Sequence, residues 1–174
     1  MKKIAVIFSN GTEEIEAFTP VDVLRRTGAQ CDIVSVSGEY PVGSHGITVK
    51  ADKTDSEFDM DLYDAIVIPG GMPGAEIISK NDIIIDALKK AFNDGKVVAS
   101  ICASPAVVLA NNGFIDGKKA TCYPAPSFIQ MMRPANYTGS DVERDGLLIT
   151  ANGPKSAMKF ALEICCALGL TPKF

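Results

Sequence analysis

The chain has 174 residues, the usual size of one domain, and is long enough to bury about 70% of its unfolded surface without disulfides or a metal. Its formal charge of -4 and the absence of a basic run argue against a nucleic-acid or anionic-membrane surface. Five cysteines without paired spacing and a single histidine argue against a disulfide framework, a CxxC zinc site or a histidine-rich metal site. We therefore expect a single domain over residues 1–174, reduced thiols, no metal, and small molecules or proteins as partners.

Short apolar runs alternate with helical patterns along the chain. Strands are predicted, in order, at residues 4–8, 31–36, 65–68, 97–101, 118–122 and 146–151. Helices are predicted at residues 13–27, 82–93, 103–110, and from Gly153-Pro154 to the stop at Gly169. Continuous apolar strands are typical of a parallel sheet buried on both faces, so the sequence predicts a layered α/β sandwich with helices on both sides.

The N-terminal apolar run ends at Phe8, before Ser9-Asn10-Gly11. It is too short for the core of a signal peptide or for a membrane span. We therefore expect a cytoplasmic protein without a membrane partner.

Cys102 lies where the strand at 97–101 is predicted to turn sharply into a helix. Ser100 and Ser104 flank it at the second position on either side, and small residues there suit a strained strand-to-helix bend that carries a nucleophile. A helix start would also favour thiolate over thiol. The alternative is an ordinary core cysteine, since free cysteines are often buried.

Two glycines and a carboxylate are candidates to work with this thiol. Gly70-Gly71 follows the strand at 65–68, and the backbone amides of Gly71 and Ala103 could form an oxyanion hole. Glu16, on the first helix beside the apolar position Ile15, could point into a closed pocket. A carboxyl next to a thiolate should tend to stay protonated. Glu13 and Glu14, by contrast, have the pattern of solvated residues in a first helical turn.

Other reactive side chains have simpler interpretations. His45 lies in the polar stretch Gly43-Ser44-His45-Gly46, which is typical of a solvated loop, so a direct Cys-His pair is doubtful. Tyr123 follows the strand at 118–122 and could reach the rim of the site, although half-buried tyrosines are common. The remaining cysteines are expected to be core or flanking residues: Cys31, Cys122, Cys165 and Cys166.

Several motifs together resemble the ThiJ/PfpI superfamily, and within it the small subgroup that includes the parkinsonism-associated deglycase. The residues that carry the resemblance span nearly the whole chain: Gly11-Thr12-Glu13-Glu14-Ile15-Glu16, Pro20 to Arg26, Pro69-Gly70-Gly71, Ala99 to Pro105, Asp145-Gly146 and Gly153-Pro154. The resemblance implies a flavodoxin-like three-layer sandwich with a mostly parallel central sheet, and a homodimer. No cofactor is expected.

The resemblance also implies roles for particular residues. It implies a nucleophile at Cys102, a protonated partner carboxyl at Glu16, and an anion pocket formed by Gly71 and Ala103. It implies an arginine, Arg26, that reaches toward the site of the partner subunit. Gly70 is a further candidate for the anion pocket, and the candidate residues at the rim are Tyr123, Arg26, His45 and Pro154.

Two departures from the superfamily bear on activity. Protease-like members have a histidine directly after the cysteine, where this chain has Ala103, and many deglycase-like relatives have a histidine where Tyr123 stands. A peptidase or an amidotransferase-like hydrolase would therefore lack its local base. Proton transfer would have to use Glu16, Tyr123, water or His45.

Two hypotheses follow from the sequence. The first is a glyoxalase- or deglycase-like enzyme in which Cys102 attacks a small α-oxoaldehyde or its adduct and Glu16 relays a proton. The second is redox sensing, in which Cys102 is oxidised and partner binding changes. No feature of the sequence singles out a chaperone or scaffold role.

Overall fold

The computed structural model describes all residues from Met1 to Phe174, and its centre is a seven-stranded sheet. The strand order is β3-β2-β1-β4-β5-β9-β8, and every pairing is parallel except that of β8 with β9. The strands are β1 (Lys3–Phe8), β2 (Gln30–Ser35), β3 (Lys53–Thr54), β4 (Ala65–Ile68), β5 (Val97–Ile101), β8 (Val142–Asp145) and β9 (Leu148–Ala151). The prediction of a mostly parallel sheet is confirmed.

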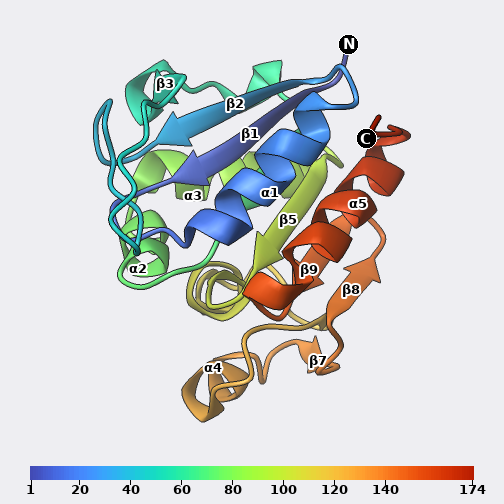
Figure 1. Cartoon of the computed structure of the whole chain (residues 1–174). Coiled ribbons are helices and arrows are strands. Elements are labelled where there is room, and N and C mark those ends of the chain that lie inside the picture. Colours follow the sequence, from blue (N-terminus) through green and yellow to red (C-terminus); the bar gives the residue numbers. More distant parts are fainter.

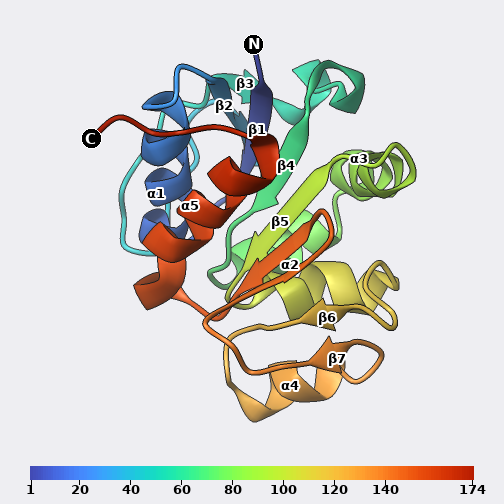
Figure 2. The same cartoon turned by 90° about the vertical axis from the view of Figure 1, so that its right-hand side faces the viewer.

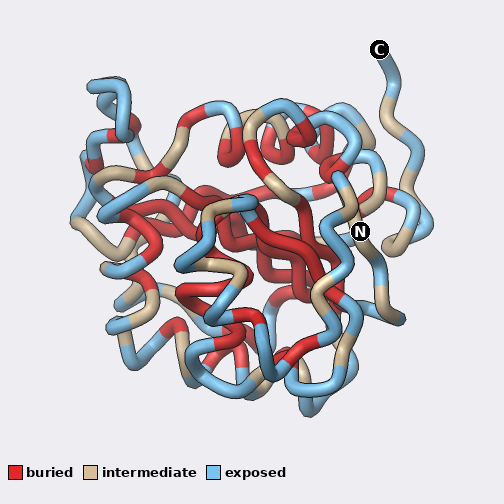
Figure 3. The backbone as a smooth tube through the Cα atoms, turned by 90° about the horizontal axis from the view of Figure 1, so that it is seen from below, coloured by how far each residue is buried: buried red, intermediate tan, exposed pale blue.

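Helices cover both faces of this sheet (Figures 1 and 2). On one face α1 (Glu14–Arg25) and α5 (Ala157–Leu168) lie side by side. On the other lie α2 (Gly74–Ser79), α3 (Asp82–Asn93) and the helical turns η3 (Pro105–Leu109) and η4 (Ala110–Asn112). Each face has its own apolar cluster, and Figure 3 shows the buried strands enclosed by exposed loops. The flavodoxin-like sandwich is therefore confirmed.

The carboxyl ends of the central strands position the site. β1 pairs with β2 on one side and with β4 on the other, so the chain changes direction across the sheet beside β1. In such sheets, ligands bind beyond the carboxyl ends of the strands near this reversal. The segments that follow β1, β4 and β5 all emerge there.

The structure corrects several predicted elements. The strand predicted at 118–122 is limited to β6 (Lys119–Ala120), which pairs with β7 (Asn136–Tyr137) outside the main sheet, near α4 (Pro126–Met131). Gly146 and Leu147 form the turn between β8 and β9 rather than a strand. The helix predicted at 103–110 is a turn followed by η3, whose hydrogen bonds are π-helical. Residues 103–110 are all buried, so their apolar pattern has no period that could distinguish these helix types.

Two further corrections concern α1 and α5, which lie together on one face of the sheet. Ile15, predicted to lie in the apolar stripe of the first helix, is 54% exposed, and α1 instead buries Glu14 and Glu16. The last helix is preceded by the 3-10 turn η5 (Pro154–Ser156). None of the helices combines the length and apolar character needed to cross a bilayer.

Candidate active site

Cys102 occupies a strained bend between β5 and η3. It is the one residue other than glycine with a positive φ, +66°. Non-glycine residues avoid this region because the Cβ atom crowds the backbone, so surrounding contacts must hold it. Two do so directly: the Cys102 amide donates to the carbonyl of Ala151 at 2.9 Å, and the Cys102 carbonyl accepts from the Tyr123 amide at 2.7 Å. The predicted strand-to-helix bend is confirmed.

Glu16 reaches this bend from α1. Its side chain is fully buried, and its Oε2 accepts a hydrogen bond from the Gly70 amide at 2.8 Å. A side chain on Gly70 would not fit, because its Cβ would lie 2.6 Å from Glu16 Oε2 and 2.6 Å from Cys102 Cβ. The missing side chain at Gly70 thus allows the carboxyl and the thiol to become neighbours.

The pKa of Glu16 is raised to about 7, chiefly by burial. Hydrogen bonds from Cys102 and Gly70 favour the carboxylate and limit the rise, while the charge of Glu13 adds to it. A carboxyl with this pKa is partly protonated at neutral pH and can both donate and accept a proton.

Burial raises the pKa of Cys102 above its ordinary value, and the neighbouring Glu16 carboxylate raises it further. The backbone amides of Ala103 and Gly71 act in the opposite direction by hydrogen bonding to the sulfur. The expectation that the bend alone would favour the thiolate is therefore corrected. Since two adjacent negative charges are costly in this site, the pair retains at least one proton around neutral pH.

The raised pKa of Glu16 predicts a pH-dependent stability. Its pKa is higher in the folded than in the unfolded state, so the stabilisation is complete below about pH 4.5 and is lost as the pH rises through about 7. The full loss is about 3 kcal/mol, because each pKa unit corresponds to about 1.4 kcal/mol. Denaturant unfolding across this range should show this decline in the wild type and a much flatter profile in Glu16→Gln. The same dependence of unfolding free energy on pH in the wild type and in Glu16→Gln would contradict the raised pKa of Glu16.

Comparison with known proteins shows the family of this chain. Residues 2–167 match the DJ-1/PfpI family. The chain belongs to that family. DJ-1 homolog B of Arabidopsis thaliana is 37% identical over 165 residues, which are 94% of this chain and 37% of that protein. The chain thus spans well under half the length of that relative.

Other relatives of this DJ-1/PfpI chain match over most of their length. The structure of oxidized DJ-1 from Toxoplasma gondii superposes with a TM-score of 0.91 and 40% identity, covering 97% of this chain and 91% of that one. Deglycase TK1284 of Thermococcus kodakarensis is 34% identical over 152 residues, covering 87% of this chain and 90% of that protein. These matches agree with the family assignment and with the fold.

Two of the candidate rim residues of this DJ-1/PfpI chain lie beside the bend. The Tyr123 backbone is bonded to Cys102, and its ring packs against Gly153, where an added Cβ would lie 3.3 Å from the ring. Pro154 follows directly and opens η5. With 44% of its surface exposed, Tyr123 is placed at the entrance rather than in the interior.

The other two candidate rim residues, His45 and Arg26, do not contact Cys102 within the chain. His45 is in an exposed loop, as predicted, and its Nδ1 lies 3.0 Å from Glu14 Oε2 rather than against the thiol. Arg26 caps the opposite end of α1, about 15 Å along the helix from Glu16, where its Nε donates to Asp22 at 2.9 Å. The placement of Arg26 toward a partner subunit stays a prediction.

The sequence-based interpretation missed the burial of Glu14. This side chain is 5% exposed, and its Oε1 accepts from the His45 amide at 2.8 Å. Burial alone would raise the pKa of Glu14, but the hydrogen bonds from His45 outweigh it and lower the pKa to about 2. Glu13, Glu14 and His45 bring ligand-type atoms within 4.8 Å of one another, close to the site but engaged with each other and with the loop. The prediction that the chain has no metal stays untested.

The other cysteines are placed as the sequence suggested, and all are free thiols. Cys31, Cys122 and Cys165 are buried, whereas Cys166 is exposed. Cys166 therefore provides an internal comparison for the reactivity of Cys102.

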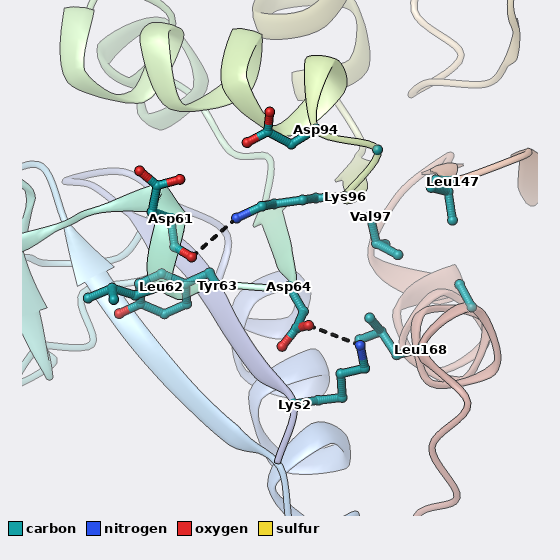
Figure 4. A pocket seen from close by; sticks show the side chains of 12 residues that line it. Lys2, Asp61, Leu62, Tyr63, Asp64, Asp94, Lys96, Val97, Leu147 and Leu168 are labelled. Carbon is teal, nitrogen blue, oxygen red and sulfur yellow. Dashed lines mark hydrogen bonds and ion pairs between the residues drawn. The ribbon is translucent and has the colours of Figure 1, made fainter.

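A separate hollow of about 440 Å³ lies at the amino ends of the strands, opposite Cys102 (Figure 4). Its charged groups are largely paired within the protein. Figure 4 shows that Lys2 pairs with Asp64, at 2.9 Å, and that the Lys96 ammonium donates to the Asp61 carbonyl, at 3.4 Å. The Lys96 ammonium also donates to the Met60 carbonyl at 2.6 Å. No residue predicted for the site lines it. The chemistry-bearing groups are thus concentrated at the other end of the sheet.

Proposed function

We propose that this chain is a cysteine-dependent enzyme that acts on small α-oxoaldehydes, with methylglyoxal as the simplest substrate. The observation that carries the proposal is the close approach of the buried Glu16 carboxyl to the half-buried Cys102 side chain beside Gly70, where the pKa of both groups is raised. The named deglycase among the relatives supports enzymatic activity of this kind. A homodimer remains part of the proposal.

The first step forms a hemithioacetal. The Cys102 sulfur adds to the aldehyde carbon, and the carbonyl π electrons move to oxygen. The Gly71 and Ala103 amides would stabilise that developing negative charge. The proton retained by the pair then moves to the oxygen, which leaves Glu16 as a carboxylate and therefore as a base.

The second step moves a hydrogen between carbons without an external oxidant. Glu16 removes the proton from the former aldehyde carbon and passes it to the oxygen on the neighbouring carbon, which gives an enediol. Glu16 then takes the proton of the hydroxyl on the first carbon and delivers it to the neighbouring carbon, which leaves Glu16 as a carboxylate. The first carbon is thereby oxidised to a thioester and the second is reduced to an alcohol. Water then cleaves the thioester, which releases lactate and the free thiol.

The test is to incubate purified protein with methylglyoxal and to measure lactate over time. Formation of lactate that depends on Cys102 is the expected result. Lactate formation no faster than that of Cys102→Ala would overturn the proposal.

A second candidate, redox sensing, is supported by the partial exposure of Cys102 and by the oxidized DJ-1 structure from Toxoplasma gondii. Two peroxide molecules would convert the thiol to a sulfinic acid and be reduced to water. Mild peroxide is expected to add two oxygen atoms at Cys102 before Cys166 is modified, measured by peptide mass spectrometry. Equal modification of the two thiols would argue against a dedicated sensor.

A further inference from the structure

Ser104 forms a buried hydrogen bond that the reaction scheme above does not use. Its side chain is fully buried, and its Oγ donates to the carbonyl of Pro69 at 2.6 Å. Serine at the start of a helical segment commonly caps the helix by accepting from a backbone amide. Here Ser104 precedes η3 and makes no such capping bond. Its hydroxyl instead joins two segments that are 35 residues apart in the chain.

The two joined segments each supply one amide to the Cys102 sulfur. Ala103 directly precedes Ser104, and Gly71 lies two residues after Pro69. The Ser104 hydrogen bond therefore connects the two segments that carry the Gly71 and Ala103 amides. No secondary-structure ladder connects these segments at this point, because β4 ends at Ile68 and β5 ends at Ile101.

The segment on the Pro69 side has little else to fix its distance from the bend. Gly70 and Gly71 carry no side chains that could pack, and Gly71 has a φ of +91°. Gly70 is tied to α1 through Glu16, and the Gly71 carbonyl accepts from the Ala75 amide at 2.8 Å. Both of these bonds lead away from η3. Apart from the Gly71 amide, which hydrogen-bonds to the Cys102 sulfur, the Ser104 hydroxyl is the polar link from this segment to the bend.

We propose that Ser104 is a positioning residue, which sets the spacing of the Gly71 and Ala103 amides around the sulfur and around any oxyanion formed there. This inference rests on the proposed function and adds a residue to it. Loss of the hydroxyl should let the two amides separate, so that they bind negative charge less well.

The test compares Ser104→Ala with Ser9→Ala. Ser9 is a matched control because it is also fully buried and its hydroxyl donates to a backbone carbonyl, that of Gly74 at the start of α2, at 3.0 Å. With methylglyoxal, kcat of Ser104→Ala is expected to fall about tenfold with little change in KM, since a displaced donor costs less than the 100-fold or more of a deleted one. Ser9→Ala should keep kcat near the wild-type value.

A second readout does not require turnover. Alkylation of Cys102 by iodoacetamide, followed by peptide mass spectrometry, reports thiolate as a function of pH. Because the two amides favour the thiolate, the profile of Ser104→Ala should move to higher pH, by about half a unit, and that of Ser9→Ala should not. If the wild type makes no lactate but this shift is present, the proposed reaction fails and the positioning role stands. Identical profiles and equal kcat in the two variants would overturn the positioning role.

Discussion

Cys102→Ala is expected to lower kcat/KM for methylglyoxal by at least about 1000-fold, because no other group can form the covalent adduct. The variant should fold, since alanine has the same Cβ as cysteine and needs no wider space in the bend at φ +66°. Lactate formation at several substrate concentrations gives the comparison, with circular dichroism to check the fold.

Cys166→Ala is the matched control for this experiment. Cys166 is the exposed cysteine, so it reports on non-specific reaction of methylglyoxal with accessible thiols. Its replacement is expected to leave lactate formation unchanged. A similar loss in both variants, or none in Cys102→Ala, would place the reaction elsewhere.

Gly71→Ala is expected to lower the free energy of unfolding by more than about 3 kcal/mol. Two costs combine: alanine is strained at φ +91°, and its Cβ would collide with backbone atoms of Gly11, Thr12 and Glu13. Backbone cannot move aside as a flexible side chain can, so the turn after β4 or the loop before α1 must shift. Denaturant unfolding measures the loss.

Gly28→Ala separates these two costs. Gly28 has a similar φ of +84°, but an added Cβ there would meet no atom within 4 Å. We expect a loss of only about 1 to 2 kcal/mol, which is the backbone strain alone. The difference between the two variants measures the close approach of the turn to the loop before α1. Equal losses would show that this contact is loose.

The close contacts at Gly70 and Gly71 explain why the site tolerates little change. Glycine at both positions brings the turn after β4 against α1 and against the bend. The same approach encloses Glu16 and raises its pKa to about 7. The tight packing of this turn, the raised pKa of Glu16 and the positive φ of Gly71 therefore all follow from the close approach of the turn to α1.

The sequence by itself determined the central strands and the location of the sharp bend that carries Cys102. The strands at 65–68 and 97–101 have the predicted bounds, because a strand buried on both faces requires a nearly continuous apolar run and each run here follows a charged residue, Asp64 or Lys96. The bend at Cys102 could also be predicted from nearby residues alone. Small residues at Ser100 and Ser104 are needed wherever the backbone reverses sharply.

Only the tertiary structure decided which neighbours surround that bend. Glu14 is buried and Ile15 exposed, against the helical pattern, because the loop around His45 covers the start of α1. The short β6 pairs outside the main sheet, and the Ser104 hydroxyl turns to Pro69 rather than to its own helix. These outcomes depend on contacts between segments distant in the chain, and local apolar periodicity carries no information about such contacts.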